Sequence, residues 1–244
     1  MNQLISKTLS EIVNEQGKAA SVFEKYHLDY CCKGKRSLQK ACEEENVVVE
    51  NIVEDLENIF SDEVTTIDFK NCKLTDLSEY IVNTHHSYVK KEMPQLITYL
   101  QKVASKHGNR HPELYKIAEI FAEISNEMTA HMNKEETILF PRMKELEQNR
   151  FEPISLIAKT PGYLALPITI MENEHEDAGN KMNEIRILSN NYTPPEDSCT
   201  TFKLLFASLQ AFEIDLHHHV NLENSILFPK ALLLEKEIQI SAHN

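Results

Sequence analysis

Glycine is scarce in this sequence: five of the 244 residues are glycine, about 2% against a usual share of roughly 7%. Tryptophan is absent altogether. A β-rich fold, a glycine-rich nucleotide-binding loop and a flexible linker protein all need positive φ angles or close backbone approach, which glycine supplies most easily. The scarcity of glycine therefore disfavours all three classes and favours a helical protein with short loops.

Basic residues are outnumbered, since 25 lysines and arginines face 38 aspartates and glutamates and the net charge is −13. Phosphate contacts need clustered lysine and arginine, so we expect neither nucleic acid nor an anionic membrane as a partner. The longest apolar run, Tyr163 to Met171, is interrupted by Pro167 and is far too short to span a bilayer. The first segment, Met1 to Lys18, is too polar for a signal peptide.

The first sixty residues and the rest of the chain follow different patterns. The segment Ser61 to Asp68 is polar, β-branched and without helical period, so we place a domain boundary there. This divides the chain into a small helical N-terminal domain, residues 1–65, and a second domain, residues 66–244. Four short helices are predicted in the first, at Thr8–Asn14, Ala19–His27, Ser37–Glu45 and Val49–Asn58.

Beyond the boundary, apolar residues recur at spacings of three and four in long stripes, the signature of amphipathic helices. Glycine and proline residues separate the stripes. We therefore predict an all-α fold in which an up-down four-helix bundle follows the small helical domain. The four stripes run from Val82 to Leu100, from Leu114 to Ile138, from Leu164 to Ile185 and from Phe202 to Ile226.

Each stripe is interrupted by a histidine, and two of them also by a glutamate. His131 and Glu135 are four residues apart and share a helix face, as do His219 and Glu223. An unpaired carboxylate on a buried face would cost several kcal/mol. A metal ion that binds both imidazole and carboxylate removes this conflict.

An internal repeat supports the same interpretation. His131 to Pro141 reads HMNKEETILFP and His219 to Pro229 reads HVNLENSILFP, with seven of eleven positions identical. The offset between them is 88 residues, and the other two stripe histidines, His86 and His175, are 89 apart. The bundle is thus predicted to consist of two copies of one unit, each of which contributes two histidines and one glutamate to a common centre.

Six such ligands are too many for one zinc ion, which usually takes four. They suit two octahedral metal ions bridged by both carboxylates and by an oxo or hydroxo group, with iron as the first choice and manganese as the second. Open coordination positions would remain for water or a small diatomic ligand. A ferritin-like centre would need two Glu-x-x-His pairs, but only Glu172 and His175 fit, and Glu172 lies off the stripe. The alternative without a metal is that these are core histidines with ordinary partners.

Neighbouring residues compete for some of these roles. Leu77 and Ile81 favour an inward His85, whereas the run from Val82 to Met93 favours His86, which we prefer as the ligand. Several others are interpreted as exposed or as groups behind the ligands: His217 and His218, which lie off the stripe, and Glu127 and Glu174, for which exposed helix charge is preferred.

Five cysteines do not form a disulfide framework, so we expect a reducing, cytoplasmic location. Cys31 and Cys32 are adjacent and cannot easily bond to each other. The basic residues Lys33, Lys35 and Arg36 and a following helix start predict lowered thiol pKa values. This describes a reactive dithiol, either a redox pair or an acceptor and donor of iron or nitrosyl groups. The alternative is two cysteines that merely pack in a small domain.

Taken together, these motifs resemble the Repair of Iron Centres family over nearly the full length. The resemblance rests on motifs in matching order: Asp29-Tyr30-Cys31-Cys32 with Lys33-Gly34-Lys35, the two His-x-x-x-Glu segments, Glu174-His175-Glu176-Asp177-Ala178-Gly179, and Pro194-Pro195 with Cys199-Thr200-Thr201.

The resemblance implies a hemerythrin-like bundle with a non-haem di-iron centre. Its terminal ligands would be four histidines and its bridges two glutamates: His86, His131, His175, His219, Glu135 and Glu223. The family ligand stands eight residues before a proline, here Pro94, which supports His86 over His85.

The implied role is the repair of iron–sulfur clusters damaged by nitric oxide or peroxide, through donation of labile iron. Damaged iron–sulfur proteins would be the partners, and Cys31 and Cys32 a transfer or docking point. Two alternatives stay open: reduction of nitric oxide at the reduced centre, and sensing or carriage of nitric oxide or O2.

Overall fold

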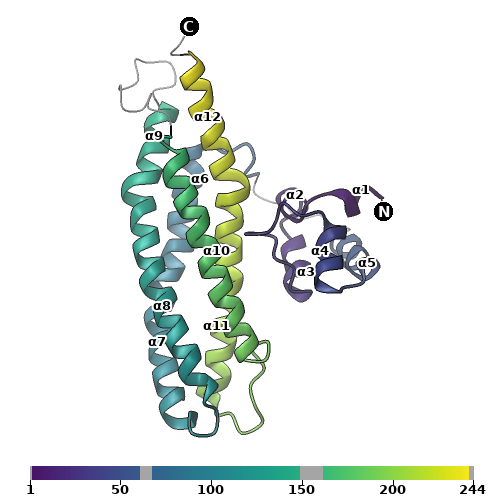
Figure 1. Cartoon of the computed structure of the whole chain (residues 1–244), viewed down its shortest axis with the longest axis vertical. Helices are drawn as coiled ribbons and strands as arrows, with labels where there is room; N and C mark the ends of the chain where they lie inside the picture. The colour runs from purple at the N-terminus through teal and green to yellow at the C-terminus, as the bar shows by residue number, and fades with distance from the viewer. Residues whose placement is uncertain (1, 61–67, 149–161, 242–244) are drawn as a thin grey trace.

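The computed structural model describes residues 2–60, 68–148 and 162–241. Within these ranges the regular elements are helices, and no strand is formed apart from one isolated bridge between Thr8 and Ser37. A tall helical bundle carries a smaller helical domain on one side, near mid-height (Figure 1). The predicted all-α architecture is confirmed, whereas the predicted boundary at residues 65 and 66 falls at 61–67, outside the described residues.

The described residues of the N-terminal domain, 2–60, form five helices: α1 (Asn2–Ser6), α2 (Leu9–Glu15), α3 (Ala19–Lys25), α4 (Leu38–Glu45) and α5 (Val49–Phe60). Local sequence explains their ends. Thr8 and Glu11 form a capping box at the start of α2, and the Ser37 hydroxyl accepts the Lys40 N–H at the start of α4. Asn46 ends α4 in the left-handed conformation, at a φ of 55°.

In residues 68–148 and 162–241, the four rods of the bundle include three short π-helical segments. The rods are α6 (Leu74–Ile81), η1 (Val82–His86) and α7 (Ser87–His107); α8 (Glu113–Lys134), η2 (Glu135–Leu139) and α9 (Phe140–Gln148); α10 (Ala165–Leu188); and α11 (Thr200–Leu222), η3 (Glu223–Leu227) and α12 (Phe228–Ser241).

The π segments explain one wrong prediction. The stripe rule places Ile138 on the buried face, but its side chain is 43% exposed and Leu139 is buried instead. A π turn inserts one residue, and each residue rotates a helix face by about 100°. Both η2 and η3 lie just before a proline, Pro141 or Pro229, whose missing N–H cannot complete an ordinary helical turn.

Two glutamates tie the rods together at one end of the bundle. Glu147 in α9 accepts the backbone N–H of Leu74 and of Thr75 at 2.7 and 3.0 Å, at the start of α6. Glu235 in α12 accepts the N–H of Leu164 at 3.0 Å, at the start of α10. The two glutamates are 88 residues apart, so the duplication extends to these caps, which the sequence motifs did not reveal.

The buried apolar side chains form two clusters along the bundle. One includes Leu74, Leu139, Met171 and Phe228 at the end where α6 and α9 meet α12. The other fills the opposite part of the bundle and continues into the N-terminal domain. The six predicted ligands fall between these clusters along every rod, so a polar layer divides the apolar core.

Candidate metal centre

Six polar side chains fill this layer, and all are withdrawn from solvent. Each is at most 1% exposed, although each carries a group that water solvates strongly: His86, His131, Glu135, His175, His219 and Glu223. Three of them stand at the ends of the π segments: His86 is the last residue of η1, and the two glutamates are the first residues of η2 and η3. Buried charged groups of this kind are found paired or bound to metal.

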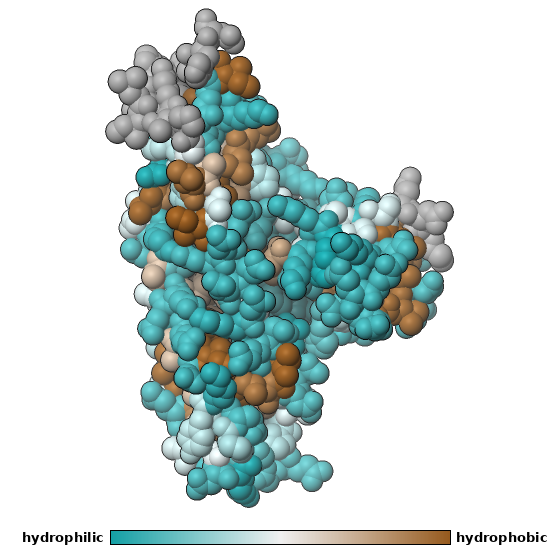
Figure 2. Space-filling model, in the orientation of Figure 1, coloured by the Kyte–Doolittle hydropathy of each residue, from teal (hydrophilic) through white to brown (hydrophobic). Residues whose placement is uncertain are grey.

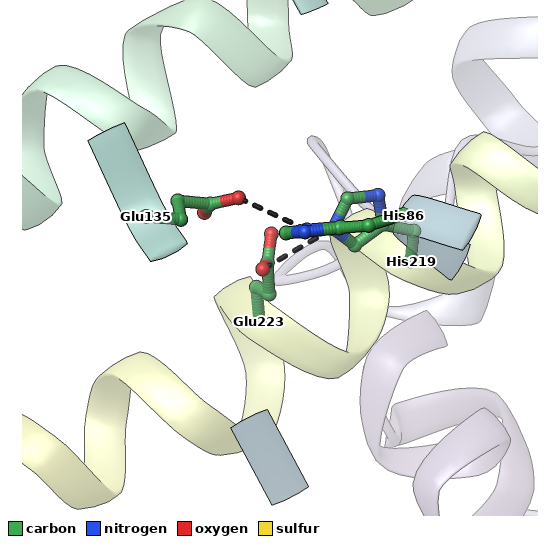
Figure 3. A group of neighbouring side chains, drawn as sticks. All are labelled: His86, Glu135, His219 and Glu223. Atoms are coloured by element: carbon green, nitrogen blue, oxygen red, sulfur yellow. Dashed lines mark ion pairs between the residues drawn. The ribbon is translucent and has the colours of Figure 1, made fainter. Parts of the chain in front are cut away.

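The six side chains form two overlapping sets. In one set, ligand atoms of His86, His219 and both glutamates lie within 4.8 Å of one another (Figure 3). In the other, ligand atoms of His131, His175 and the same two glutamates do so. Glu135 and Glu223 belong to both sets, which is the arrangement that two bridging carboxylates produce.

The short contacts run from imidazole to carboxylate. Glu135 Oε2 lies 3.3 Å from His86 Nε2 and 3.3 Å from His131 Nε2. Glu223 Oε2 lies 3.1 Å from His175 Nε2, and its Oε1 lies 3.2 Å from His219 Nε2. Each glutamate therefore faces one histidine of each set, and all four Nε2 atoms turn toward the same space.

Several of these buried atoms have no hydrogen-bond partner among the described residues. They include both carboxylate oxygens of Glu135 and of Glu223, and the Nε2 atoms of His86 and His219. Leaving so many buried donors and acceptors unpaired is costly, and each such group in a native protein calls for a partner. Two cations with nitrogen and oxygen ligands would satisfy all of them, so the donor set fits a dinuclear centre.

Electrostatics keep the carboxylates charged. Burial raises the pKa of Glu223, but His219 and His175 outweigh burial and hold it well below the ordinary value. Burial likewise lowers the pKa of His131, but Glu135 and Glu174 raise it to about 10. Without metal, His131 is therefore protonated at neutral pH, and metal binding must release that proton.

Comparison with known proteins identifies the bundle. Residues 78–231, well over half of the chain, match the hemerythrin HHE cation binding domain. The chain belongs to the hemerythrin family. This fold binds two iron ions, and the buried histidines and glutamates of this hemerythrin-like bundle suit such a pair. Residues 5–59 match a separate family, ScdA_N, described as a domain of unknown function.

Full-length relatives combine both parts. The chain is 32% identical over 224 residues to the iron-sulfur cluster repair protein YtfE of Citrobacter koseri, covering 92% of this chain and 96% of the relative. It is 31% identical over 227 residues to the YtfE protein of Pectobacterium atrosepticum, covering 93% and 96%. The chain is thus also a member of this family of repair proteins, as the motifs predicted.

Three of the four histidines are held by a hydrogen bond at the ring nitrogen that faces away from the centre. The Nδ1 atom of His86 lies 2.7 Å from Glu136, and that of His131 lies 2.8 Å from Glu174. The Nδ1 atom of His175 lies 2.9 Å from Asn224. Such partners fix the ring orientation of metal-binding histidines. The prediction that Glu174 is exposed helix charge is wrong, because the side chain is half-buried against His131.

Sequence reasoning missed Glu136 and Asn224, but a signal was present. Each directly follows one of the shared glutamates, and the two are 88 residues apart, so they occupy equivalent positions of the repeat. Glu127 does match its prediction: it is exposed and paired with Lys181.

The competing histidines lie outside both sets. His85 is buried, but its Nδ1 atom lies 2.9 Å from Asp215. His217 is buried as well, with Nδ1 2.7 Å from Glu24 of the N-terminal domain. An exposed position for His217 is therefore excluded, because helix α3 covers this part of α11.

The dithiol lies against the bundle close to the centre. Cys32 Sγ is 3.5 Å from the backbone carbonyl oxygen of His175, and 3.8 Å from Cys31 Sγ. One oxygen of Asp29 accepts the backbone N–H groups of Cys31 and Cys32 at 3.0 and 2.9 Å. Gly179 lies directly under the dithiol, since a Cβ there would lie 3.5 Å from Cys32 Sγ, an ordinary contact distance.

The predicted thiolate is wrong for Cys31. A hydrogen bond to Cys32, burial and the nearby Asp29 raise the pKa of Cys31 well above the ordinary thiol value. The basic residues do not offset this, because Lys33 and Lys35 are exposed and Arg36 pairs with Glu44. Cys31 is therefore a neutral thiol in this arrangement.

Proposed function

We propose that this chain is a di-iron protein that repairs damaged iron–sulfur clusters by supplying iron. The observation that carries the proposal is similarity over more than nine-tenths of the chain to iron-sulfur cluster repair proteins, across both the dicysteine domain and the bundle. None of the described helices combines the length and the apolar character needed to cross a bilayer. Damaged iron–sulfur proteins of the cytoplasm are the proposed partners.

In this proposal the ligand set is the six-residue layer. His86 and His219 would hold one ion, His131 and His175 would hold the other, and the two shared glutamates would contact both. The burial of all six and their unpaired ring and carboxylate atoms support this assignment. Bound iron supplies an exchangeable, redox-active cation. The two apolar clusters on either side keep water from the carboxylates, which strengthens their attraction for cations.

The dithiol is proposed as the point at which iron or a nitrosyl group is passed to or from a client. Cys31 and Cys32 line a cavity of about 290 Å³ between the N-terminal domain and α10, together with Asp29 and Glu176. Sulfur and carboxylate atoms of Asp29, Cys31 and Cys32 lie close enough to bind one cation together. Because Cys31 is neutral, binding a cation there would displace its proton.

Iron content with the optical spectrum of the oxidised protein tests the centre. We expect about two iron ions per chain and an oxo-bridge absorption band, the state of a dinuclear site. His131→Ala should lose most of the iron, whereas His111→Ala, a histidine outside the centre, should keep it. A single zinc ion in the wild-type protein would contradict the proposal.

Repair itself is tested with a dehydratase whose iron–sulfur cluster has been nitrosylated. The loaded wild-type protein should restore its activity and His131→Ala should not. Release of N2O by the reduced protein, without restoration of the dehydratase, would favour nitric oxide reduction instead.

For the dithiol, Cys31→Ser with Cys32→Ser should lose repair but keep iron, and Cys42→Ser, in the core of the same domain, serves as the control. Full repair by the double variant would exclude the transfer role.

A further inference from the structure

The four buried imidazoles are not held alike. Glu136 and Glu174 hold His86 and His131, and Asn224 holds His175, each at the Nδ1 atom. The Nδ1 atom of His219 is buried and has no hydrogen-bond partner in the described part of the chain. Of the two sets, one therefore has both rings anchored and the other has only one.

The duplication shows where the missing partner would stand. Glu174 directly precedes His175 and reaches across to His131. The equivalent residue in the first half is His85, which directly precedes His86 and lies 89 positions before Glu174. His85 does reach its counterpart target, His219, but as a stacked ring, with centroids 5.5 Å apart and planes 3° apart.

The Nδ1 atom of His85 is directed to Asp215, at 2.9 Å, and not to His219. Stacking supports the face of the His219 ring but fixes neither its tautomer nor its rotation about the ring axis. When Nε2 binds a cation, Nδ1 carries the proton, and here that buried N–H has nothing to donate to. Removal of such an outer partner typically weakens metal binding about 10- to 100-fold.

We infer that the two metal positions are unequal, and that the ion between His86 and His219 is the one that this protein releases first. The inference rests on the proposed function, since it identifies which of two proposed iron ions is donated. A cavity of about 380 Å³ borders the same side and is lined by His85, Tyr80 and His218. The ion between His131 and His175 is the retained one.

Removal of iron by a ferrous chelator tests the inequality. The reduced wild-type protein should lose its iron in two phases of equal amplitude, with rates about 10- to 100-fold apart. Glu174→Gln should accelerate the slow phase alone. His85→Glu with Asp215→Asn restores a carboxylate at the repeat-equivalent position, keeps the local charge balanced, and should slow the fast phase alone.

Glu127→Gln, an exposed glutamate of the same helix as His131, is the matched control and should change neither phase. A merely structural effect of the substitutions would move both phases together, which would overturn the inference. Thermal unfolding of each metal-free variant shows whether it folds. If the double variant His85→Glu with Asp215→Asn does not fold, the Glu174→Gln result still tests the inference.

The position of the released ion is read directly from crystals. After soaking in chelator until half of the iron is gone, anomalous scattering should persist between His131 and His175 and disappear between His86 and His219. Equal loss at both positions, or loss only of the ion between His131 and His175, would overturn the inference. If the wild-type protein gave either of these results but still bound two ions and repaired clusters, only this inference would fail. If it bound no iron at all, the proposed function would fail as well.

Discussion

The first half of the bundle, α6 to α9, and the second half, α10 to α12, have similar interiors but different outer surfaces. Both halves place two histidines and a glutamate in the polar layer, and both close a helix start with a glutamate from the last helix. The N-terminal domain, by contrast, is hydrogen-bonded to the second half through Asn14, Glu24 and Cys32.

The surfaces differ where this domain docks. His217 and His218 are buried and half-buried beneath it, while their equivalents in the first half, Thr129 and Ala130, are exposed. In the proposed di-iron centre the interior of both halves is constrained by metal geometry, since a displaced ligand would leave an unpaired buried charge. The outer faces carry no such constraint, so they can diverge to fit a second domain.

The largest expected effect breaks the symmetry of the centre. Glu135→Ala and Glu223→Ala each remove a carboxylate that faces both metal positions, so both variants should lose both ions. We expect iron binding at least about 10-fold weaker in each, the lower end of what even outer partners contribute. Iron per chain after gel filtration is the measurement, with Glu127→Ala as the control. If either variant retained one tightly bound ion, its glutamate would serve one position and would not be a bridge.

A smaller effect tests the difference between the outer surfaces. Gly179 lies under Cys32, and its equivalent in the first half is the exposed Lys90. Gly179→Lys inserts that first-half side chain beneath the dithiol and should lift the N-terminal domain from α10. The buried Cys31 should then react with iodoacetamide about 10-fold or more faster, because a difference of 1.4 kcal/mol in docking is tenfold.

Gly179→Ala is the matched control for this experiment. Its Cβ would meet Cys32 Sγ at 3.5 Å, an ordinary contact, so docking should persist. In the interior of a helix alanine is also favoured over glycine by roughly 0.5–1 kcal/mol, so the variant should be slightly more stable. Equal alkylation rates in Gly179→Lys and Gly179→Ala would show that Gly179 is not needed for docking.

A third prediction concerns the feature that the halves share. Glu147→Ala and Glu235→Ala each leave helix N-terminal N–H groups without their acceptor, and loss of such a cap typically costs about 1 kcal/mol. The melting temperature of the metal-free protein should fall by about 2–4 °C in each variant. Unequal losses would indicate that the two caps, though equivalent in the repeat, contribute differently to the stability of the two halves.

Much of this was accessible from sequence because the ligands interrupt apolar stripes. A histidine or glutamate on a buried face is conspicuous, and the 88-residue repeat pairs His131 with His219 and Glu135 with Glu223. The structure places His86 in the polar layer and directs His85 to Asp215, and that His86 is a metal ligand stays a prediction.

What the sequence could not supply depends on partners from distant segments. The caps made by Glu147 and Glu235 join residues more than seventy positions apart, and no local pattern distinguishes them from exposed glutamates. The neutral state of Cys31 likewise follows from burial and from Asp29, whereas the neighbouring lysines, prominent in the sequence, are exposed. The π turn that exposes Ile138 breaks the regular period on which stripe counting relies.

The smallest expected effect is a pH dependence of the cap that Glu147 forms in the first half of the bundle. Burial raises the pKa of Glu147, but the hydroxyl and N–H of Thr75 and the N–H of Leu74 outweigh it and lower the pKa below 4.5. A carboxyl with a lowered folded-state pKa stabilises the fold above its unfolded-state pKa, and this contribution is lost as the pH falls through the folded-state value. Amide hydrogen exchange at the start of α6 should therefore speed up as the pH drops below 4.5, after correction for the intrinsic rate. In Glu147→Gln the corrected exchange should already be faster at neutral pH, by a factor that corresponds to less than about 1 kcal/mol, and should not respond to acid. The start of α10, measured in the same samples, should be unaffected by this substitution, and a parallel change there would mean that the two ends open as one unit.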